Sequence, residues 1–268
     1  MPATAVSTIA LPAGDHAALL PAVAAMGVEG IEVAPSRIWS DTWGGLSAGM
    51  ISAYRHAVEA AGMNVVGLHS LFFDHPELGL FRPEARAATL DFLVHLSTVC
   101  RDLGGRTLIW GGGRRRGPVA KQDAFDESVR FMGELCARIE GHGTCLCFEP
   151  LGPKDSDFVN SAFEAVEIAA AVNHPAFAVQ LDAKALVENA EDTLAPFTAA
   201  KSRLVHFHAN QPGLGPLDRG PVDHRKMGDF LRQIGYDGYV SIEQRMGNES
   251  DPLADIRRSV AVLKDCYA

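Results

Sequence analysis

Short runs of β-forming residues alternate with longer helical patterns from one end of the chain to the other. The runs that we predict as strands are residues 7–11, 30–34, 64–70, 106–111, 144–149, 177–182, 204–209 and 239–244. The helical patterns lie at residues 16–27, 48–62, 83–105, 126–143, 161–173, 192–201, 224–235 and 251–266. Eight strand–helix units in 268 residues are typical of a (β/α)8 TIM barrel. A doubly wound open sheet is the alternative, but no G-x-G-x-x-G motif follows the first predicted strand.

Composition and charge narrow the class of protein. No linker or change in composition divides the chain, so we expect residues 1–268 to form one barrel domain. The net charge of −9 argues against a nucleic-acid partner and an anionic membrane surface, because both require a basic footprint. We find neither a signal peptide nor an apolar run long enough for a membrane span. Five scattered cysteines show no disulfide or zinc-ribbon spacing. We therefore expect a cytoplasmic protein with a small-molecule substrate and leave a homo-oligomer open.

Polar residues stand at the C-terminal ends of several predicted strands. In a TIM barrel these ends carry the chemistry. The residues found there are Glu32, His69, Glu149, Asp182, His208 and Glu243. The last four follow one another at intervals of about one strand–helix unit. We therefore expect four metal-ligand types to lie at the same height on four neighbouring strands.

Strand alternation supports a metal site at this height. Side chains two residues apart share a face of a strand, so Cys145 and Cys147 point the same way as Glu149, into the barrel. His206 lies one layer below His208 in the same manner. Three carboxylates that converge in a partly dry pocket repel one another, and a divalent cation removes that repulsion. Three carboxylates with one imidazole suit Mn²⁺, with Mg²⁺, Co²⁺ and Zn²⁺ as alternatives.

At these residues the sequence resembles the xylose-isomerase-like TIM barrels known as sugar phosphate isomerases/epimerases. They include the ketose 3-epimerases related to tagatose 3-epimerase. The matching segments are CFEPLG, VQLDAKAL, VHFHANQPGLGPLDRGPVD and YDGYVSIEQ, together with GLHS on the third strand. The resemblance covers the whole chain and is strongest over residues 144–245. It implies that Glu149, Asp182, His208 and Glu243 bind a divalent metal, usually Mn²⁺. It also implies that Glu149 and Glu243 act as acid and base on opposite faces of the substrate.

Substrate contacts are less well defined by the resemblance. Ala185 stands where these epimerases usually have a histidine, and Asp155 replaces a glutamate that often follows the Glu-Pro pair. Asn210 and Arg219 match positions that contact substrate in the family. Our predicted substrate-binding set is Glu32, His69, Trp110, Asp155, Lys184, Asn210 and Arg219.

Several of these residues also have a structural interpretation. Glu32 and His69 are equally compatible with buried hydrogen bonds, Trp110 with core packing and Lys184 with an ion pair. The glycine-rich segment WGGGRRRGP follows the fourth predicted strand, so its arginines, 114–116, lie on the catalytic face. They either receive a carboxylate or phosphate of the substrate or form a solvated loop or subunit contact.

The predicted chemistry is isomerisation or epimerisation of a keto sugar or a related polyhydroxy carbonyl compound. The metal would chelate two neighbouring oxygens and stabilise an enediolate, while one glutamate removes a proton and the other returns it. A lyase, dehydrating or decarboxylating a keto-inositol or keto acid at the same metal site, is the alternative. An endonuclease-IV-like DNA repair enzyme is disfavoured by the acidic charge and the few histidines. A non-catalytic barrel would leave a complete metal site unused.

Overall fold

Eight parallel strands close into a barrel in the computed structural model, which describes residues 1–14, 16–247 and 250–268. The strands are β1 (Ala3–Ser7), β2 (Gly30–Val33), β3 (Asn64–Leu68), β4 (Thr107–Trp110), β5 (Cys145–Phe148), β6 (Phe177–Asp182), β7 (Leu204–Ala209) and β8 (Tyr239–Ile242). They are arranged in sequence order, and β8 pairs with β1 to close the ring. The predicted TIM barrel is therefore confirmed.

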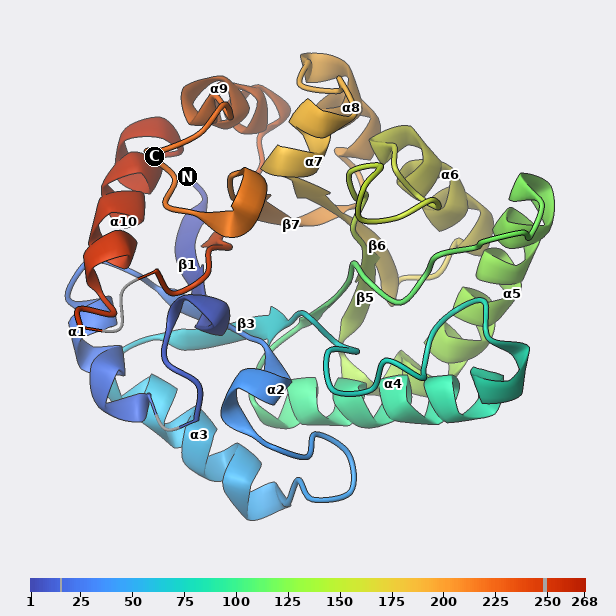
Figure 1. The fold of residues 1–268 in the computed structure, drawn as a ribbon, viewed down its shortest axis with the longest axis horizontal. Helices are drawn as coiled ribbons and strands as arrows, with labels where there is room; N and C mark the ends of the chain where they lie inside the picture. Colours follow the sequence, from blue (N-terminus) through green and yellow to red (C-terminus); the bar gives the residue numbers. More distant parts are fainter. Residues whose placement is uncertain (15, 248–249) are drawn as a thin grey trace.

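Helices surround the strands on the outside of the barrel, as Figure 1 shows. They are α1 (Leu20–Ala24), α2 (Pro35–Ile38), α3 (Ala48–Ala60), α4 (Arg86–Asp102), α5 (Lys121–Ile139), α6 (Ala162–Val172), α7 (Ala183–Glu188), α8 (Leu194–Ala200), α9 (His224–Ile234) and α10 (Ala254–Cys266). Local signals fix their ends: Ser161 and Glu164 form a capping box at the start of α6, and left-handed Gly235 follows α9. The short helices α2 and α7 were not expected from the sequence. In the part of the chain described, no helix has the length and apolar character needed to cross a membrane.

The first strand lies closer to the N-terminus than the sequence pattern predicts. The expected strand covered residues 7–11, whereas β1 ends at Ser7 and a 3₁₀ turn, η1 (Thr8–Ala10), follows it. The Ser7 hydroxyl accepts a hydrogen bond from the Ile9 amide at 3.2 Å, and this local cap ends the strand. The β-branched residues Thr8 and Ile9 give the turn the appearance of a strand in the sequence. As a result, Ser7 rather than Leu11 stands at the C-terminal end of β1.

Two apolar layers support the barrel, one outside the sheet and one inside it. The larger core packs between the sheet and the helices and includes Phe148 of β5. A separate small cluster is formed by Ile109, Cys145, Cys147 and Ala178. Because side chains alternate along β5, the two cysteines face inward while Phe148 faces the helices, as predicted. Polar residues occupy the barrel above this cluster, towards the C-terminal ends of the strands.

Candidate metal centre and active site

Four donor side chains meet at the C-terminal end of the barrel. Glu149 follows β5, Asp182 ends β6, His208 lies on β7 and Glu243 follows β8. One donor atom from each lies within 4.8 Å of those of the others. His208 Nδ1 is 2.8 Å from Glu149 Oε1, 3.7 Å from Asp182 Oδ2 and 3.6 Å from Glu243 Oε2. The structure thus brings together the four side chains that the strand ends single out.

Sheet register and a helix cap position Asp182. It is the register partner of His208 on the neighbouring strand. Its Oδ1 accepts a hydrogen bond from the Ala185 amide at 2.7 Å and so caps α7. Its Oδ2 accepts one from Asn210 Nδ2 at 2.5 Å, and the same nitrogen donates to Glu243 Oε2 at 2.8 Å. Asn210 therefore holds two of the four donors in place, and its predicted contact with substrate stays a prediction.

Glu32 lies beneath the four donors, inside the barrel. Its side chain has no exposed surface, which favours its structural interpretation, as a buried hydrogen-bond partner, over its predicted substrate contact. His208 Nε2 lies 3.1 Å from both Glu32 oxygens, His206 Nε2 lies 3.0 Å from Oε1, and the Ser241 hydroxyl donates to Oε2 at 2.7 Å. Burial raises the pKa of Glu32, but the two histidines outweigh burial and hold it well below its usual range. The ionised Glu32 can thus accept the Nε2 proton of His208 and leave Nδ1 turned towards the carboxylates.

His69 contacts Glu243 from the β3 side. Its Nδ1 lies 3.6 Å from Glu243 Oε1, and its Nε2 shares a hydrogen bond of 2.5 Å with the Ser7 hydroxyl. The imidazole is only 2% exposed. These contacts favour the structural interpretation of His69, as a residue that orients Glu243, over its predicted substrate contact.

The two glutamates differ strongly in acidity. Burial raises the pKa of Glu149 to about 7, although the nearby His208 opposes the shift. Burial also raises the pKa of Glu243, but His208 and His69 outweigh it and hold the value at about 2. Burial lowers the pKa of His208, yet the surrounding carboxylates raise it well above its usual value. Without a cation, the surrounding carboxylates therefore keep His208 protonated at neutral pH, and Glu149 is about half protonated.

The space around Glu149 is shaped for its carboxylate. A β-carbon on Gly111, the residue after β4, would lie 2.2 Å from Glu149 Oε2, so only glycine leaves room there. The carboxylate thus has a preformed place among the other donors. Three carboxylates and one imidazole with this proximity and burial fit a divalent cation of the hard or borderline class.

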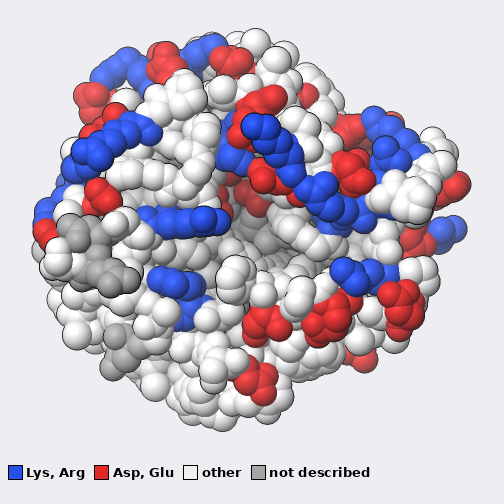
Figure 2. Space-filling model, viewed as in Figure 1, with Lys and Arg blue, Asp and Glu red and all other residues white. Residues whose placement is uncertain are grey.

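Two adjoining cavities open beside these donors. The first has a volume of about 520 Å³ and the second about 270 Å³, and Leu214, Glu243 and Arg245 line both of them. The second also reaches Glu149 and Asp182. Figure 2 shows the hollow at the centre of this face, with acidic side chains in its depth and basic side chains around its rim. The cavities have the size at which proteins bind small molecules.

Comparison with known proteins places the chain in a family. Residues 20–266 match the family model described as "Xylose isomerase-like TIM barrel". The chain belongs to this family. D-psicose 3-epimerase of Ruminiclostridium cellulolyticum (strain ATCC 35319 / DSM 5812 / JCM 6584 / H10) is 28% identical over 131 residues. That match spans 48% of this chain and 45% of the relative, so it covers about half of either protein.

Solved structures show the same fold over the full length of this xylose isomerase-like barrel. The crystal structure of D-psicose 3-epimerase with D-tagatose, from Clostridium cellulolyticum H10, superposes with a TM-score of 0.82 at 18% identity, covering 98% of each chain. The crystal structure of 3-keto-D-glucoside 4-epimerase from E. coli has a TM-score of 0.80 at 18% identity and covers 99% of this chain and 100% of that one. At such identities the likeness establishes the fold alone.

Asp155 and Lys184 line the second cavity of this xylose isomerase-like barrel and form an ion pair with each other. Burial lowers the pKa of Lys184, but the bond to Asp155 outweighs it and raises the pKa above its usual value. Their contact with substrate stays a prediction, since both are at the cavity wall.

Two residues of the predicted substrate-binding set lie away from the cavities beside the donors, and their contact with substrate stays a prediction. Trp110 is fully buried between the sheet and the helices, and its Nε1 donates to the Gly112 carbonyl at 2.7 Å. Because Ile109 faces the barrel interior, the next residue on β4 must face outward. Arg219 is exposed, and its side chain lines neither of the two cavities beside the donors.

The arginines of the loop after β4 donate hydrogen bonds to main-chain carbonyls. Arg114 is buried, and its guanidinium donates to the carbonyls of Glu149, Phe158 and Val159. Arg115 donates to the Lys154 carbonyl, and Arg116 donates to the carbonyls of Val119 and Asp157. Burial lowers the pKa of Arg114 to about 10. These arginines hold the loops after β4 and β5 together, so Arg114 is not part of a solvated loop, and the predicted anion contact of this segment stays a prediction.

One neighbour of the donors has no counterpart among the predicted residues. Gln180 Nε2 donates to Glu149 Oε1 at 3.2 Å from the middle of β6. It stands two residues before Asp182 and therefore points into the barrel on the same face. The alternation of side chains along β6 is therefore the sequence signal that could have identified Gln180.

Proposed function

We propose that this protein is a divalent-metal-dependent epimerase or isomerase of a keto sugar or a related polyhydroxy carbonyl compound. The observation that carries the proposal is the meeting of Glu149, Asp182, His208 and Glu243 beside a cavity, at the catalytic end of a xylose isomerase-like barrel. The activity named for its relative, D-psicose 3-epimerase, supports the choice of reaction.

The four side chains would hold the cation, and Mn²⁺ suits this donor set best, with Mg²⁺, Co²⁺ or Zn²⁺ as alternatives. Bound there, a divalent cation supplies electrophilic polarisation of the substrate's oxygens and makes the neighbouring C–H more acidic. Glu32 contributes by fixing the orientation of His208 from below. Asn210 contributes by fixing the adjacent oxygens of Asp182 and Glu243.

Glu149 and Glu243 carry the proton transfers in this proposal. Both line the second cavity, and they follow β5 and β8, which are not neighbours in the barrel. They can therefore face one substrate from different sides. One carboxylate takes the proton from the carbon beside the carbonyl, and the other delivers a proton to the opposite face or to the adjacent carbon. Their different pKa values agree with opposite roles, because an acid and a base need separate environments.

A substrate screen tests the proposal. The Mn²⁺-loaded protein is incubated in D₂O with ketoses, inososes and keto acids, and products are read by NMR. We expect deuterium at the reacting carbon of a ketose and the appearance of its epimer or aldose isomer. Release of water or CO₂ from an inosose or keto acid would replace the isomerase with the lyase. A protein that retains no metal and leaves every compound unchanged would refute both.

Metal affinity should rise with pH, because Glu149 and His208 must lose protons when the cation binds. The pKa of Glu149 is about 7 without a cation, and that of His208 is raised above its usual value, so metal binding must displace their protons. Each displaced proton weakens apparent affinity by roughly tenfold per pH unit below the group's pKa. Mn²⁺ titrations at pH 6, 7 and 8 should therefore show affinity rising with pH. Glu149→Gln, which carries no titratable proton, should flatten the slope below pH 7. An affinity independent of pH would contradict the assignment.

A further inference from the structure

We infer that the first cavity binds an anionic group of the substrate, a phosphate or a carboxylate, through Arg37 and Arg245. Both arginines line this cavity, which adjoins the candidate metal centre at Glu243. The inference rests on the proposed function, because it places the anionic group and the reacting carbon on one molecule. It narrows the substrate class to sugar phosphates and sugar acids.

Arg37 is a partly buried cation without a counter-ion among the residues that the structure describes. It lies on α2, directly after β2, and its Nη2 donates to the Leu11 carbonyl. Its Nε is enclosed and has no hydrogen-bond partner within residues 1–14, 16–247 and 250–268. Nor does any carboxylate in those ranges approach its guanidinium within ion-pair distance. A buried charge without a partner is costly, and an anionic ligand would provide both the opposite charge and an acceptor for Nε.

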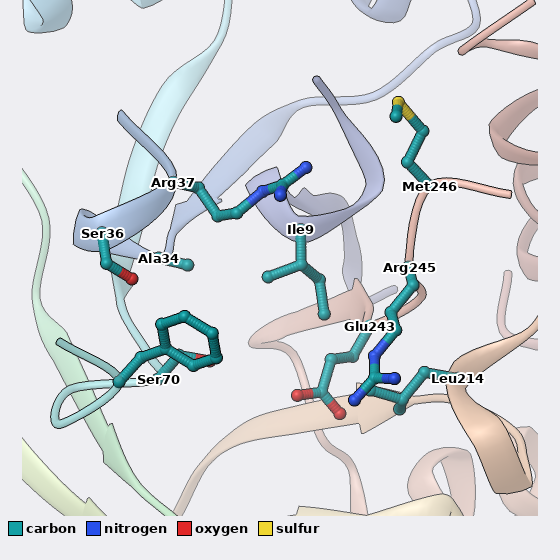
Figure 3. A pocket seen from close by; sticks show the side chains of 10 residues that line it. Ile9, Ala34, Ser36, Arg37, Ser70, Leu214, Glu243, Arg245 and Met246 are labelled. Atoms are coloured by element: carbon teal, nitrogen blue, oxygen red, sulfur yellow. The ribbon is translucent and has the colours of Figure 1, made fainter. Parts of the chain in front are cut away.

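Arg245 faces the same cavity from the loop after β8, and β1 lies between that strand and β2, which precedes Arg37. It follows β8, is exposed, and lines the second cavity as well as the first. Figure 3 shows its guanidinium beside Glu243 and Leu214, with Arg37 across the cavity beyond Ile9. Its side chain has no ion pair to any described carboxylate, in contrast to Lys184, which is paired with Asp155.

The wall that carries these arginines is held by main-chain hydrogen bonds between separate loops. The Met246 amide donates to the Ile9 carbonyl at 3.0 Å, and the Arg245 amide donates to the Leu214 carbonyl at 2.8 Å. The Arg37 carbonyl accepts from the Gly14 amide at 2.7 Å. The backbone on both sides of the cavity is thus fixed before a ligand arrives, which lowers the entropic cost of binding. Ile9 and Leu214 also give the cavity apolar walls, which strengthen a charge–charge contact by excluding water.

The distribution of charge sets the orientation of the ligand. The second cavity is lined by four carboxylates, Glu149, Asp155, Asp182 and Glu243. Carboxylates repel an anionic group, and within residues 1–14, 16–247 and 250–268 Glu243 is the only carboxylate that lines the first cavity. A substrate that spans both cavities therefore places its anionic end at the arginines and its carbonyl end at the donors. This location also agrees with the general tendency of TIM barrels to bind phosphate at the loops after strands 7 and 8.

Binding of inorganic phosphate to the Mg²⁺-loaded protein tests the subsite directly, by ³¹P NMR. Arg37→Gln and Arg245→Gln should each raise the phosphate Kd about tenfold or more, because each removes a charge-assisted contact. Arg203→Gln is the matched control: it removes the same charge just before β7, at the opposite end of the barrel, and should leave the Kd unchanged. A phosphate Kd of about 50 mM is roughly the weakest binding that would matter for a substrate. If binding does not saturate at about that concentration, the inference is overturned. If phosphate binds the Arg37→Gln, Arg245→Gln double variant as tightly as it binds wild type, Mg²⁺ alone holds it. That result would also overturn the inference.

Matched substrates distinguish the two sources of the anion. Solvent deuterium exchange is measured for D-fructose, D-fructose 6-phosphate and 5-keto-D-gluconate with the Mn²⁺-loaded protein. We expect the phosphate, the carboxylate or both to exceed fructose in kcat/KM by about tenfold or more, and the preference to disappear in the Arg37→Gln, Arg245→Gln double variant. Equal kcat/KM for all three compounds, or a preference that survives in the double variant, would overturn the inference.

Failure of the inference and failure of the proposed function give different results. A protein that holds Mn²⁺ and exchanges the hydrogen of a neutral ketose, but shows no dependence on the arginines, retains the function and loses the anion subsite. A protein that binds phosphate through the arginines, but neither holds Mn²⁺ nor exchanges any hydrogen, retains the subsite and loses the function.

Discussion

Replacing Glu149 or Glu243 with glutamine should lower turnover of the substrate by about 10²–10⁴-fold, the usual loss when a general base is removed. Glutamine preserves the size of the side chain and one oxygen for the cation, but it cannot accept the proton. Both side chains line the cavity next to the donors, on strands that are not neighbours. Each should therefore be required for net conversion, and kcat for the two variants is measured at saturating Mn²⁺.

Isotope exchange separates the roles of the two glutamates. In D₂O, one variant should still exchange deuterium into unreacted substrate while it forms little product, and the other should do neither. The assignments should swap when the reaction starts from product, because each carboxylate serves one face of the carbon. If both variants keep the metal and turn over near the wild-type rate, the two-base mechanism is wrong.

Asp182→Asn and His208→Ala should each weaken metal binding by about 10–100-fold or more, since even the loss of residues that only support ligands reaches this size. His208 stands between the other three donors, and Asp182 is its partner in the sheet. Bound Mn²⁺ per chain is measured after dialysis. Asp155→Asn is the matched control, because it removes a carboxylate from the same cavity but not from the cluster of donors. Stoichiometric metal in the Asp182→Asn, His208→Ala double variant would exclude this site.

The barrel and its four donors were predictable because their signals are local. Each of the four donors stands within one residue of the C-terminal end of its strand, after a mostly apolar run, and parallel strands in a closed barrel must end on the same side. The period of two along β5 and β7 then places Glu149 above the cysteines and His208 above His206. No long-range contact is needed for either step, so the sequence pattern is sufficient.

The features that the sequence pattern did not predict depend on conformations that the period of two does not determine. Ser7 ends β1 by capping a turn whose residues favour strands. The substrate contact of Trp110 is predicted from its position at a strand end alone. Ile109 faces the barrel interior, so Trp110 faces the helices. Arg37 and Arg245 lie on loops that become one wall only through contacts between β1, β2, β7 and β8. Such contacts join residues that are far apart in sequence. Loops have no periodic pattern of side chains from which these contacts could be predicted.

The donors and the residues that orient them lie in different halves of the barrel, and this separation has a consequence for folding. All four donors lie on β5 to β8, whereas Ser7, Glu32 and His69, which orient two of them, lie on β1 to β3. A nascent chain that has folded seven strands lacks Glu243 and leaves the ring open between β7 and β1. A C-terminal half alone would carry every donor, but nothing would fix the tautomer of His208. The complete donor set of the proposed metal site therefore exists only after β8 has joined β1, so a cation bound there would stabilise the closed barrel and not an earlier stage of folding.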